Sequence, residues 1–436
     1  MRKNSALFRR LRIIVCVLAT FVLFLSHNHA PAWRRHGHAQ NPHPMLVGYF
    51  PQWGLYYEQP YYVKHLVDNG SAALLDQINY AQGFVSNGKC SVADPRADLN
   101  TTYTIENSVS GRADDPASPF RGYFHQLKEL KKRYPHLKIL ISLEGNPAGF
   151  AEDARPENRR TFVESCVDTF LRGHFAAGIQ QPGIFDGFDI DWEYPKAEDA
   201  ANFRALLEEF QRQMRAVRPG LRLSIAVGHS PRMQTGTDFT AIAPLVDQVG
   251  IMNYDYTGPW SPTTGFLAPL FSSAADPRHS NSIERNIAEY EAAGVPAEKL
   301  LMGVPFYGYS WTAVERTNNG LFQTGRGVHG DEPYRYIRTL MSGSSAYRDA
   351  HSQAPWLFDG TTFWTYEDAV SVRYKVSYAA KERLGGVMVW ELSEDTGDAE
   401  LLNTAHHALL YPMGASVFEV EAEEPRPAAP AVGAGR

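Results

Sequence analysis

Three carboxylic acids stand two residues apart in the segment FDGFDIDWEYP, residues 185–195. Asp189, Asp191 and Glu193 would point to one side of a β-strand, because successive side chains of a strand alternate between its faces. Like charges held this close raise the pKa of at least one of them, so one carboxyl group can keep its proton near neutral pH and act as a general acid. Asp186 is out of this register, and we expect a structural role for it.

Two other interpretations of this acidic segment must be weighed. An acidic strand end can be a solvated loop, or it can bind a divalent metal through oxygen ligands. The Phe, Ile and Trp residues that alternate with the acids argue against a solvated loop. The spacing favours acid catalysis over a metal site, but it does not exclude the metal site.

The elements that must position these acids are eight short apolar runs, each followed by a loop and in most cases by an amphipathic stretch. Near-continuous apolar character is typical of parallel strands that are buried on both faces. The runs are residues 45–50, 77–85, 137–143, 184–191, 221–227, 248–254, 299–306 and 385–390. We expect the acids to face the C-terminal mouth of the sheet that these strands form.

Helices are predicted between the strands. The clearest covers 201–217, with an apolar face that includes Phe203 and Phe210 and a stop at Pro219-Gly220. Another carries Phe124 and ends before Pro135, and a third covers 157–175. Strand–helix alternation repeated eight times predicts an α/β fold of the closed (β/α)8 TIM-barrel type. The alternative is an open doubly wound sheet, but no Gly-rich turn follows the first strand.

The interval between the last two strands is longer than one helix requires. We therefore expect a small inserted subdomain at about 309–362, between strands 7 and 8 of the barrel. The segment 419–436 is rich in Ala, Pro and Glu and is predicted to be disordered.

The N-terminal region has the features of a targeting signal. Basic residues precede an apolar run at 13–25, whose length is that of a signal-peptide core, and small residues follow at Ala30, Ala32 and Ala39. We predict a signal peptide and junction over 1–39, a secreted (extracellular or periplasmic) protein, and no stable membrane span after cleavage. An uncleaved membrane anchor is the alternative.

The charge of the chain limits the classes of binding partner, and its cysteines relate to the redox state of its compartment. Lys and Arg number 42 against 48 Asp and Glu, a net charge of −6 without a long basic stripe, so nucleic acid is a poor candidate partner. Beyond the signal, Cys90 and Cys166 remain. Export permits a disulfide between them, but a buried free thiol is at least as compatible with the apolar helix face around Cys166.

The acidic segment resembles the DGxDxDxE signature of glycoside hydrolase family 18, to which many chitinases belong. Other matches follow in the same order as in that family: LVGYFPQWG at 46, MNYDYTGPW at 252, MGVPFYG at 302 and GGVMVWELSEDT at 385. The resemblance covers 45–412. It implies a glycosidase domain over that range, an insertion of the α+β type, chitin or N-acetylglucosamine oligosaccharides as substrate, and neither a metal nor another cofactor.

The resemblance also implies residue roles. Glu193 would act as general acid and then as base, Asp191 would orient the substrate's 2-acetamido group and share a proton with Asp189 and Glu193, and Tyr254 would donate a hydrogen bond to the acetamido carbonyl. Trp390 would form the floor under the sugar. The remaining substrate-binding residues implied by the matches are Tyr49, Trp53, Ser142, Tyr194, Met252, Asp255 and Trp260.

The implied reaction is retaining and substrate-assisted, because in this family the acetamido oxygen replaces an enzyme nucleophile. Two positions depart from the family pattern. Glu144 stands where the third strand usually has glycine, and Tyr309 stands where many members carry Arg. An endo-β-N-acetylglucosaminidase of the same fold is the alternative, followed by a non-catalytic sugar-binding protein. Such binding proteins usually lack the glutamate of the signature, which this chain retains.

Overall fold

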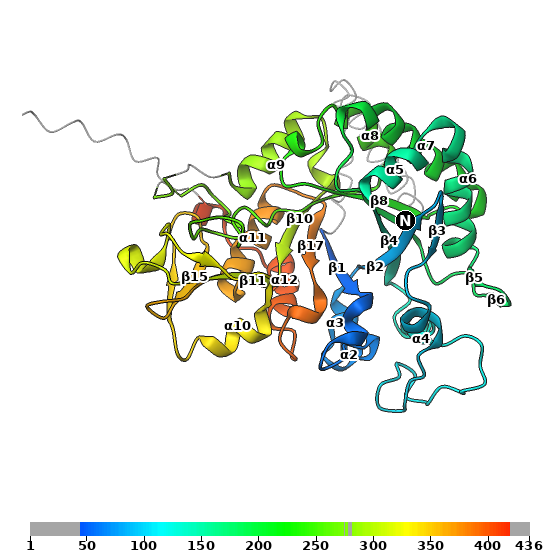
Figure 1. Ribbon diagram of the computed structural model, residues 1–436, viewed down its shortest axis with the longest axis horizontal. Helices are drawn as coiled ribbons and strands as arrows, with labels where there is room; N and C mark the ends of the chain where they lie inside the picture. Colours follow the sequence, from blue (N-terminus) through cyan, green and yellow to red (C-terminus); the bar gives the residue numbers. More distant parts are fainter. Residues whose placement is uncertain (1–43, 274, 278–280, 419–436) are drawn as a thin grey trace, which may run out of the picture. The chain divides into compact units, whose positions relative to one another are not determined.

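All eight apolar runs form parallel strands that close into a barrel (Figure 1). The computed structural model describes residues 44–273, 275–277 and 281–418. In Figure 1 the first strand (blue) lies beside the last (orange), and this pairing completes the ring. The barrel strands are β1 (Met45–Pro51), β2 (Gln77–Ser86), β4 (Lys138–Gly145), β7 (Gly187–Asp191), β8 (Arg222–Val227), β9 (Gln248–Ile251), β10 (Leu300–Pro305) and β17 (Gly386–Trp390). The predicted TIM barrel is confirmed.

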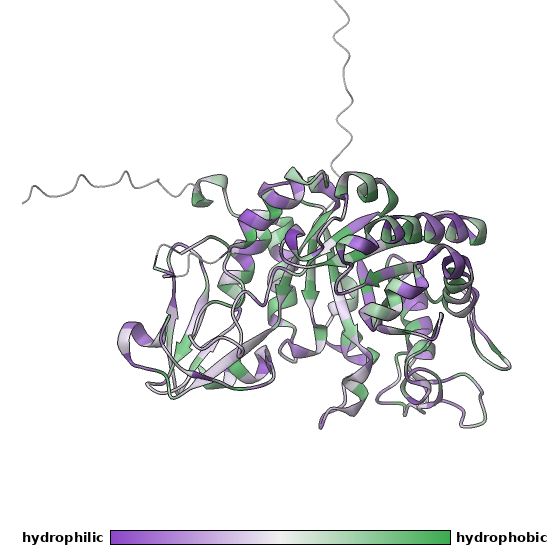
Figure 2. Ribbon diagram, turned by 45° about the horizontal axis from the view of Figure 1, so that its top comes forward, coloured by the Kyte–Doolittle hydropathy of each residue, from purple (hydrophilic) through white to green (hydrophobic). Residues whose placement is uncertain are grey.

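The strands are buried because helices cover the outside of the barrel. Figure 2 shows hydrophobic residues along the central strands. Trp192, which follows β7, packs outward against Phe150 and Phe203 of two covering helices, with ring centroids 5.5 and 5.6 Å apart. The helices are α2 (Val63–Asp68), α3 (Ser71–Leu74), α4 (Gly122–Arg133), α5 (Pro147–Asp153), α6 (Pro156–Cys166), α7 (Ala200–Val217), α8 (Phe239–Ile242), α9 (Ile283–Ala292), α11 (Ala369–Lys381) and α12 (Glu400–Leu410).

The predicted helices are present, but one of them is shorter than expected. Helix α7 ends at Val217, as its apolar face and the following Pro-Gly pair predict. The predicted helix 157–175 instead ends as α6 at Cys166, and a wider turn follows to Leu171. Gly173 then adopts a left-handed φ of 75°, and a Cβ there would lie 2.3 Å from the backbone of Gln181. The chain turns at this glycine because other residues tolerate that conformation poorly.

A second sheet occupies the long interval between β10 and β17. It is antiparallel and spans 307–365, slightly wider than the predicted 309–362, because its first strand follows β10 almost directly. Trp311 is fully buried in its core. The elements are β11 (Tyr307–Thr312), β12 (Arg326–Gly327), β13 (Glu332–Pro333), α10 (Tyr334–Leu340), β14 (Ser345–Arg348), β15 (Pro355–Phe358) and β16 (Phe363–Thr365).

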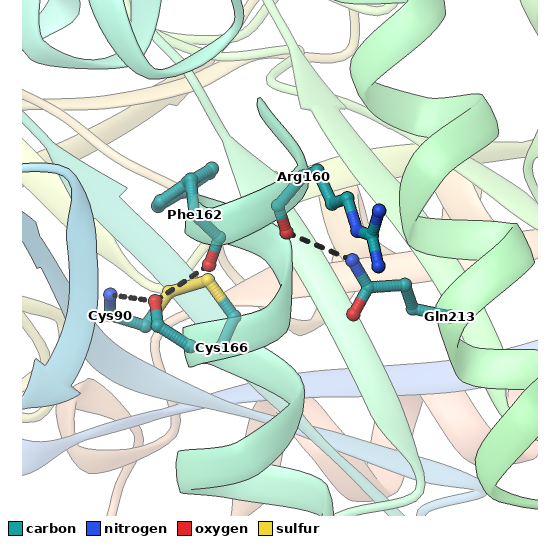
Figure 3. The surroundings of a disulfide bond; sticks show 6 residues. Cys90, Arg160, Phe162, Cys166 and Gln213 are labelled. Atoms are coloured by element: carbon teal, nitrogen blue, oxygen red, sulfur yellow. Dashed lines mark hydrogen bonds between the residues drawn. A yellow bond between two sulfur atoms is a disulfide. The ribbon is translucent and has the colours of Figure 1, made fainter. Parts of the chain in front are cut away.

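The two cysteines form a disulfide (Figure 3). Cys90 lies on β3 (Lys89–Val92), an antiparallel extension of the barrel sheet, and Cys166 is the last residue of α6, 76 positions away. The backbone N–H of Cys90 also donates to the Ser165 hydroxyl at 2.9 Å. The bond therefore joins the edge of the sheet to a covering helix, and the free-thiol alternative is wrong.

Asp186 has the structural role expected from its register. It receives Lys131 Nζ at 2.6 Å, Arg218 Nη2 at 3.1 Å and the backbone N–H of Ile139 at 3.0 Å. These partners hold the pKa of Asp186 below its usual value despite burial.

The signal peptide predicted for 1–39 and the disordered tail predicted for 419–436 lie outside the described residues. Within the described ranges, the helices are too short or too polar to span a bilayer.

Candidate active site

Asp189, Asp191 and Glu193 form a row that we call the acid file. It lies at the C-terminal end of β7, and the neighbouring strands β4 and β8 pair with β7 in a defined register. Asp189 pairs with Ser142 of β4 and with Ser224 of β8, and Asp191 pairs with Glu144 of β4. Because strand side chains alternate, Asp189 and Asp191 share the inner face while Trp192 points outward. The barrel thus places the acids at its mouth, as their spacing predicted.

Asp189 is the innermost acid and is held by three hydroxyl groups. Its Oδ2 accepts from the Tyr49 hydroxyl at 2.7 Å and the Ser142 hydroxyl at 2.9 Å, and its Oδ1 accepts from the Ser224 hydroxyl at 2.5 Å. Burial raises the pKa of Asp189, and these hydrogen bonds oppose that rise. With 1% exposure, Asp189 contacts protein only and fixes the inner end of the file.

Asp191 differs from Asp189 because one of its oxygens has no protein donor. Its side chain is 9% exposed, and no described residue donates a hydrogen bond to its buried Oδ1. Burial raises the pKa of Asp191 well above its usual value, and the charges of Glu193, Asp189 and Glu144 add to this effect. A buried polar atom without a partner is costly, so this oxygen is suited to accept a hydrogen bond from a bound molecule.

Glu193 is the outermost acid and is accessible from solvent. Partial enclosure in the cavity wall raises its pKa, a hydrogen bond from Tyr194 opposes this, and the charge of Asp255 raises it further. A carboxyl group with a raised pKa that is open to a cleft is suited to proton donation.

These acids border a cavity of about 490 Å³ with largely aromatic walls. Trp390 lies next to Tyr49, with ring centroids 5.2 Å apart, and Trp260 is 62% exposed with its ring edge against Tyr309. The lining residues are Tyr49, Asp191, Glu193, Tyr194, Ala226, His229, Met233, Met252, Tyr254, Asp255, Trp260, Tyr307, Tyr309, Asp331 and Trp390. Flat apolar faces combined with a few polar groups suit a sugar ring.

Tyr254 and Asp255 form the wall after β9. Burial, followed by the charges of Asp191 and Asp255, raises the pKa of Tyr254 well above its usual value, so its hydroxyl remains a donor at neutral pH. Asp255 has a left-handed φ of 64°, which Asp tolerates better than most residues, and it accepts from the Tyr307 hydroxyl at 2.6 Å. Tyr309 also donates to Asp255. The position at which the family resemblance leads us to expect Arg therefore holds an uncharged side chain.

The structure brings nine of the twelve predicted site residues to the cavity wall. The other three lie behind it: Asp189 and Ser142 hydrogen-bond each other at the inner end of the file, and Trp53 packs against Trp390 with ring centroids 6.1 Å apart. Five further residues line the cavity but were not predicted from the sequence: Ala226, His229, Met233, Tyr307 and Asp331. Position alone could have suggested Ala226, His229 and Tyr307, because they end or follow predicted barrel strands. Met233 and Asp331 lie in loops without a periodic pattern.

The chemistry of the acid file differs from that of a metal site. Each oxygen of Asp189 already accepts a hydroxyl proton, whereas a metal ligand offers its lone pairs to the ion. Within the ranges that the structure describes, no group of three or more His, Cys, Asp or Glu residues could hold a metal ion.

A closed parallel barrel whose strand ends present carboxyl groups to an aromatic cavity belongs to the class of barrel glycoside hydrolases. Residues 45–395 match glycosyl hydrolases family 18. The chain is 32% identical to Chitinase 63 of Streptomyces plicatus over 392 residues and to Chitinase C of Streptomyces lividans over 370 residues, which are 86% and 81% of this chain. The chain belongs to glycosyl hydrolases family 18.

The structural neighbours agree with this assignment. The catalytic domain of psychrophilic chitinase B from Arthrobacter TAD20 superposes with a TM-score of 0.79 at 31% identity, covering 84% of this chain and 95% of that one. Chitinase ChiA74 from Bacillus thuringiensis gives a TM-score of 0.73 at 28% identity, covering 84% and 70%. The chain spans only 62% and 58% of the lengths of the two Streptomyces relatives.

Proposed function

We propose that this protein is a secreted chitinase that hydrolyses β-1,4 linkages between N-acetylglucosamine units with retention of configuration. The observation that carries the proposal is the pair formed by Asp191 and Glu193. Asp191 lines a sugar-sized cavity and has a buried oxygen without a described partner, and Glu193 is an accessible acid two residues further along the chain. The relatives named as chitinases support this substrate.

The first half of the reaction needs a proton and a nucleophile. Glu193 gives its proton to the glycosidic oxygen as the bond to the leaving sugar breaks. The carbonyl oxygen of the 2-acetamido group attacks the anomeric carbon and forms a cyclic oxazolinium. Asp191 accepts the acetamido N–H through its free oxygen, and Tyr254 donates to the acetamido oxygen. Both contacts hold the acetamido group in the attacking position above Trp390.

The second half of the reaction reverses these proton movements. The carboxylate of Glu193 takes a proton from water, and the water attacks the anomeric carbon from the face that the leaving group vacated. The ring opens, the acetamido group is restored, and Glu193 regains its proton. The negative charge of Asp191 stabilises the positive ring.

The central experiment is proton NMR of the first product formed from chitin oligosaccharides. We expect the β-anomer, and we expect fully deacetylated chitosan and cellulose to be inert because neither carries the acetamido nucleophile. Initial release of the α-anomer would mean direct attack by water with inversion, and the mechanism would be wrong. Equal cleavage of a glycoprotein glycan would favour the endo-β-N-acetylglucosaminidase alternative. Sugar binding without any product would favour a non-catalytic binding protein.

A further inference from the structure

The cavity contains acids without compensating cations. Four carboxyl groups line it, from Asp191, Glu193, Asp255 and Asp331, and no Lys or Arg is among its described lining residues. The imidazole in the wall belongs to His229, whose pKa is lowered by burial, so it is neutral near pH 7. A recess with one sign of charge and low-dielectric walls attracts ligands of the opposite sign.

The proposed reaction uses neither Asp255 nor Asp331, but Asp255 already accepts a hydrogen bond from Tyr307, whereas Asp331 does not. Asp331 lies on the inserted sheet immediately before β13, and its side chain is exposed. Burial raises the pKa of the nearby Glu394 well above its usual value, and the charges of Glu391 and Asp331 add to this effect. Asp331 is thus an exposed carboxyl group at the cavity wall, with a second, buried carboxyl group behind it.

No Lys or Arg of the described ranges forms an ion pair with Asp331. Arg338 pairs with Glu400 at 3.2 Å, and Arg348 pairs with Asp368. Arg335, four positions from Asp331, donates to the backbone oxygen of Ser393. Asp331 therefore offers a negative charge to a molecule in the cavity.

We propose that Asp331 is a specificity-determining residue that binds the ammonium group of a glucosamine unit next to the cleaved bond, so that partially deacetylated chitin is a preferred substrate. Chitin and its deacetylated form differ only in carrying an acetamido or an ammonium group on each sugar. The unit at the cleavage point must keep its acetamido group for Asp191 and Tyr254. The ammonium group therefore belongs on a flanking unit. This inference rests on the proposed function.

The test compares kcat/KM on soluble, partially deacetylated chitosan with kcat/KM on a fully acetylated oligosaccharide. The ratio of interest is kcat/KM on chitosan divided by kcat/KM on the acetylated oligosaccharide. In Asp331→Asn we expect this ratio to fall about tenfold, equivalent to about 1.4 kcal/mol. The wild-type ratio should also fall as salt is added, because salt screens the interaction. Asp331→Glu keeps the charge and should keep most of the ratio.

The matched control is Glu315→Gln. It removes the same charge from an exposed position on the inserted segment that does not line the cavity, and its ratio should equal that of the wild type. Sequencing of wild-type products by mass spectrometry should find glucosamine enriched beside the new chain end, and Asp331→Asn should lose this enrichment.

Two results separate failure of this inference from failure of the proposed function. If the wild type cleaves the acetylated oligosaccharide but Asp331→Asn leaves the ratio unchanged, the inference is wrong and the chitinase proposal stands. If the wild type cleaves neither substrate, both are wrong. An equal fall of the ratio in Glu315→Gln would also overturn the role of Asp331, because the effect would then come from net charge alone.

Discussion

At the residue scale, Asp191 and Glu193 must be treated as one titrating pair. Burial raises the pKa of both groups, and the charge of Glu193 raises that of Asp191 further. Since the interaction is mutual, a proton on either group changes the other, and a measured pH profile describes the pair. Replacing one acid should therefore alter the behaviour of both.

The first residue-scale prediction concerns the proton donor. Glu193→Gln keeps the shape of the side chain but removes its proton-transfer capacity, so hydrolysis should fall by at least about 10²–10⁴-fold. Binding of a chitin oligosaccharide should persist, because the aromatic walls are unchanged. The measurements are initial rates and calorimetric titration on the same preparation. A variant that retains a tenth of the wild-type rate would show that another group donates the proton.

The second prediction contrasts two aspartates of the same segment. Asp191→Asn should lower kcat at least about a hundredfold, because it removes the charge that we propose holds the acetamido group and that interacts with Glu193. Asp186→Asn should instead keep kcat per folded molecule and lose about 1–3 kcal/mol of unfolding free energy, because its ion pairs lie away from the cavity. Urea unfolding and steady-state kinetics separate the two. Equal kinetic effects of both variants would contradict the assignment.

The third prediction concerns Glu144, the extra carboxylate of β4. It is the register partner of Asp191, its charge raises the pKa of Asp191, and it repels Glu193. Glu144→Gln removes the repulsion between Glu144 and Glu193, so Glu193 should lose its proton at lower pH. The alkaline limb of the kcat/KM profile should therefore move to lower pH. Glu157→Gln, an exposed position on α6, is the control and should leave the limb in place. An unmoved limb in Glu144→Gln would mean that solvent screens this charge.

At the element scale, the register of three neighbouring strands builds the inner site. Pairing of β4, β7 and β8 sets Ser142 and Ser224 on either side of Asp189. A slip of one residue in this pairing would turn every side chain of the strand to the opposite face. The outer face of β7 is apolar and packs on the helices. This packing therefore keeps the acids on the inner face. Packing of Trp192 therefore supports the orientation of the three acids.

A prediction at this scale concerns the disulfide between β3 and α6. Closing a loop of this length should stabilise the fold by about 2–4 kcal/mol, which for a domain of this size is about 2–5 °C in Tm. Reductant should lower the Tm of the wild type by that amount and leave Cys90→Ala/Cys166→Ala unaffected. Activity should persist, because neither cysteine lines the cavity. Identical Tm values with and without reductant would mean that the bond adds no stability.

At the scale of the whole molecule, barrel closure and the inserted sheet complete the site. Closure brings Tyr49 of β1 to Asp189, 140 positions away, and Trp390 of β17 beside Tyr49. The inserted sheet adds Tyr309 and Asp331 to the wall. A barrel mouth alone would lack these two side chains, so the insertion contributes part of the cavity wall and one of its carboxyl groups.

Features that depend on local periodicity could be predicted from the amino-acid order alone. A two-residue repeat of acids between apolar residues identified the file from Asp189 to Glu193, and eight apolar runs identified the barrel. Motif resemblance then located Tyr254, Asp255 and Trp390. These predictions needed only the alternation of strand side chains and the burial of parallel strands.

The meetings of distant groups became visible only in the folded molecule. Folding joined Cys90 to Cys166, supplied Ser224 as a third donor to Asp189, and placed Asp331 in the cavity wall. None of these pairs leaves a periodic signal, because their partners come from different strands or loops. Contacts of this kind arise when the barrel closes, and closure depends on the packing of the whole chain rather than on any single segment.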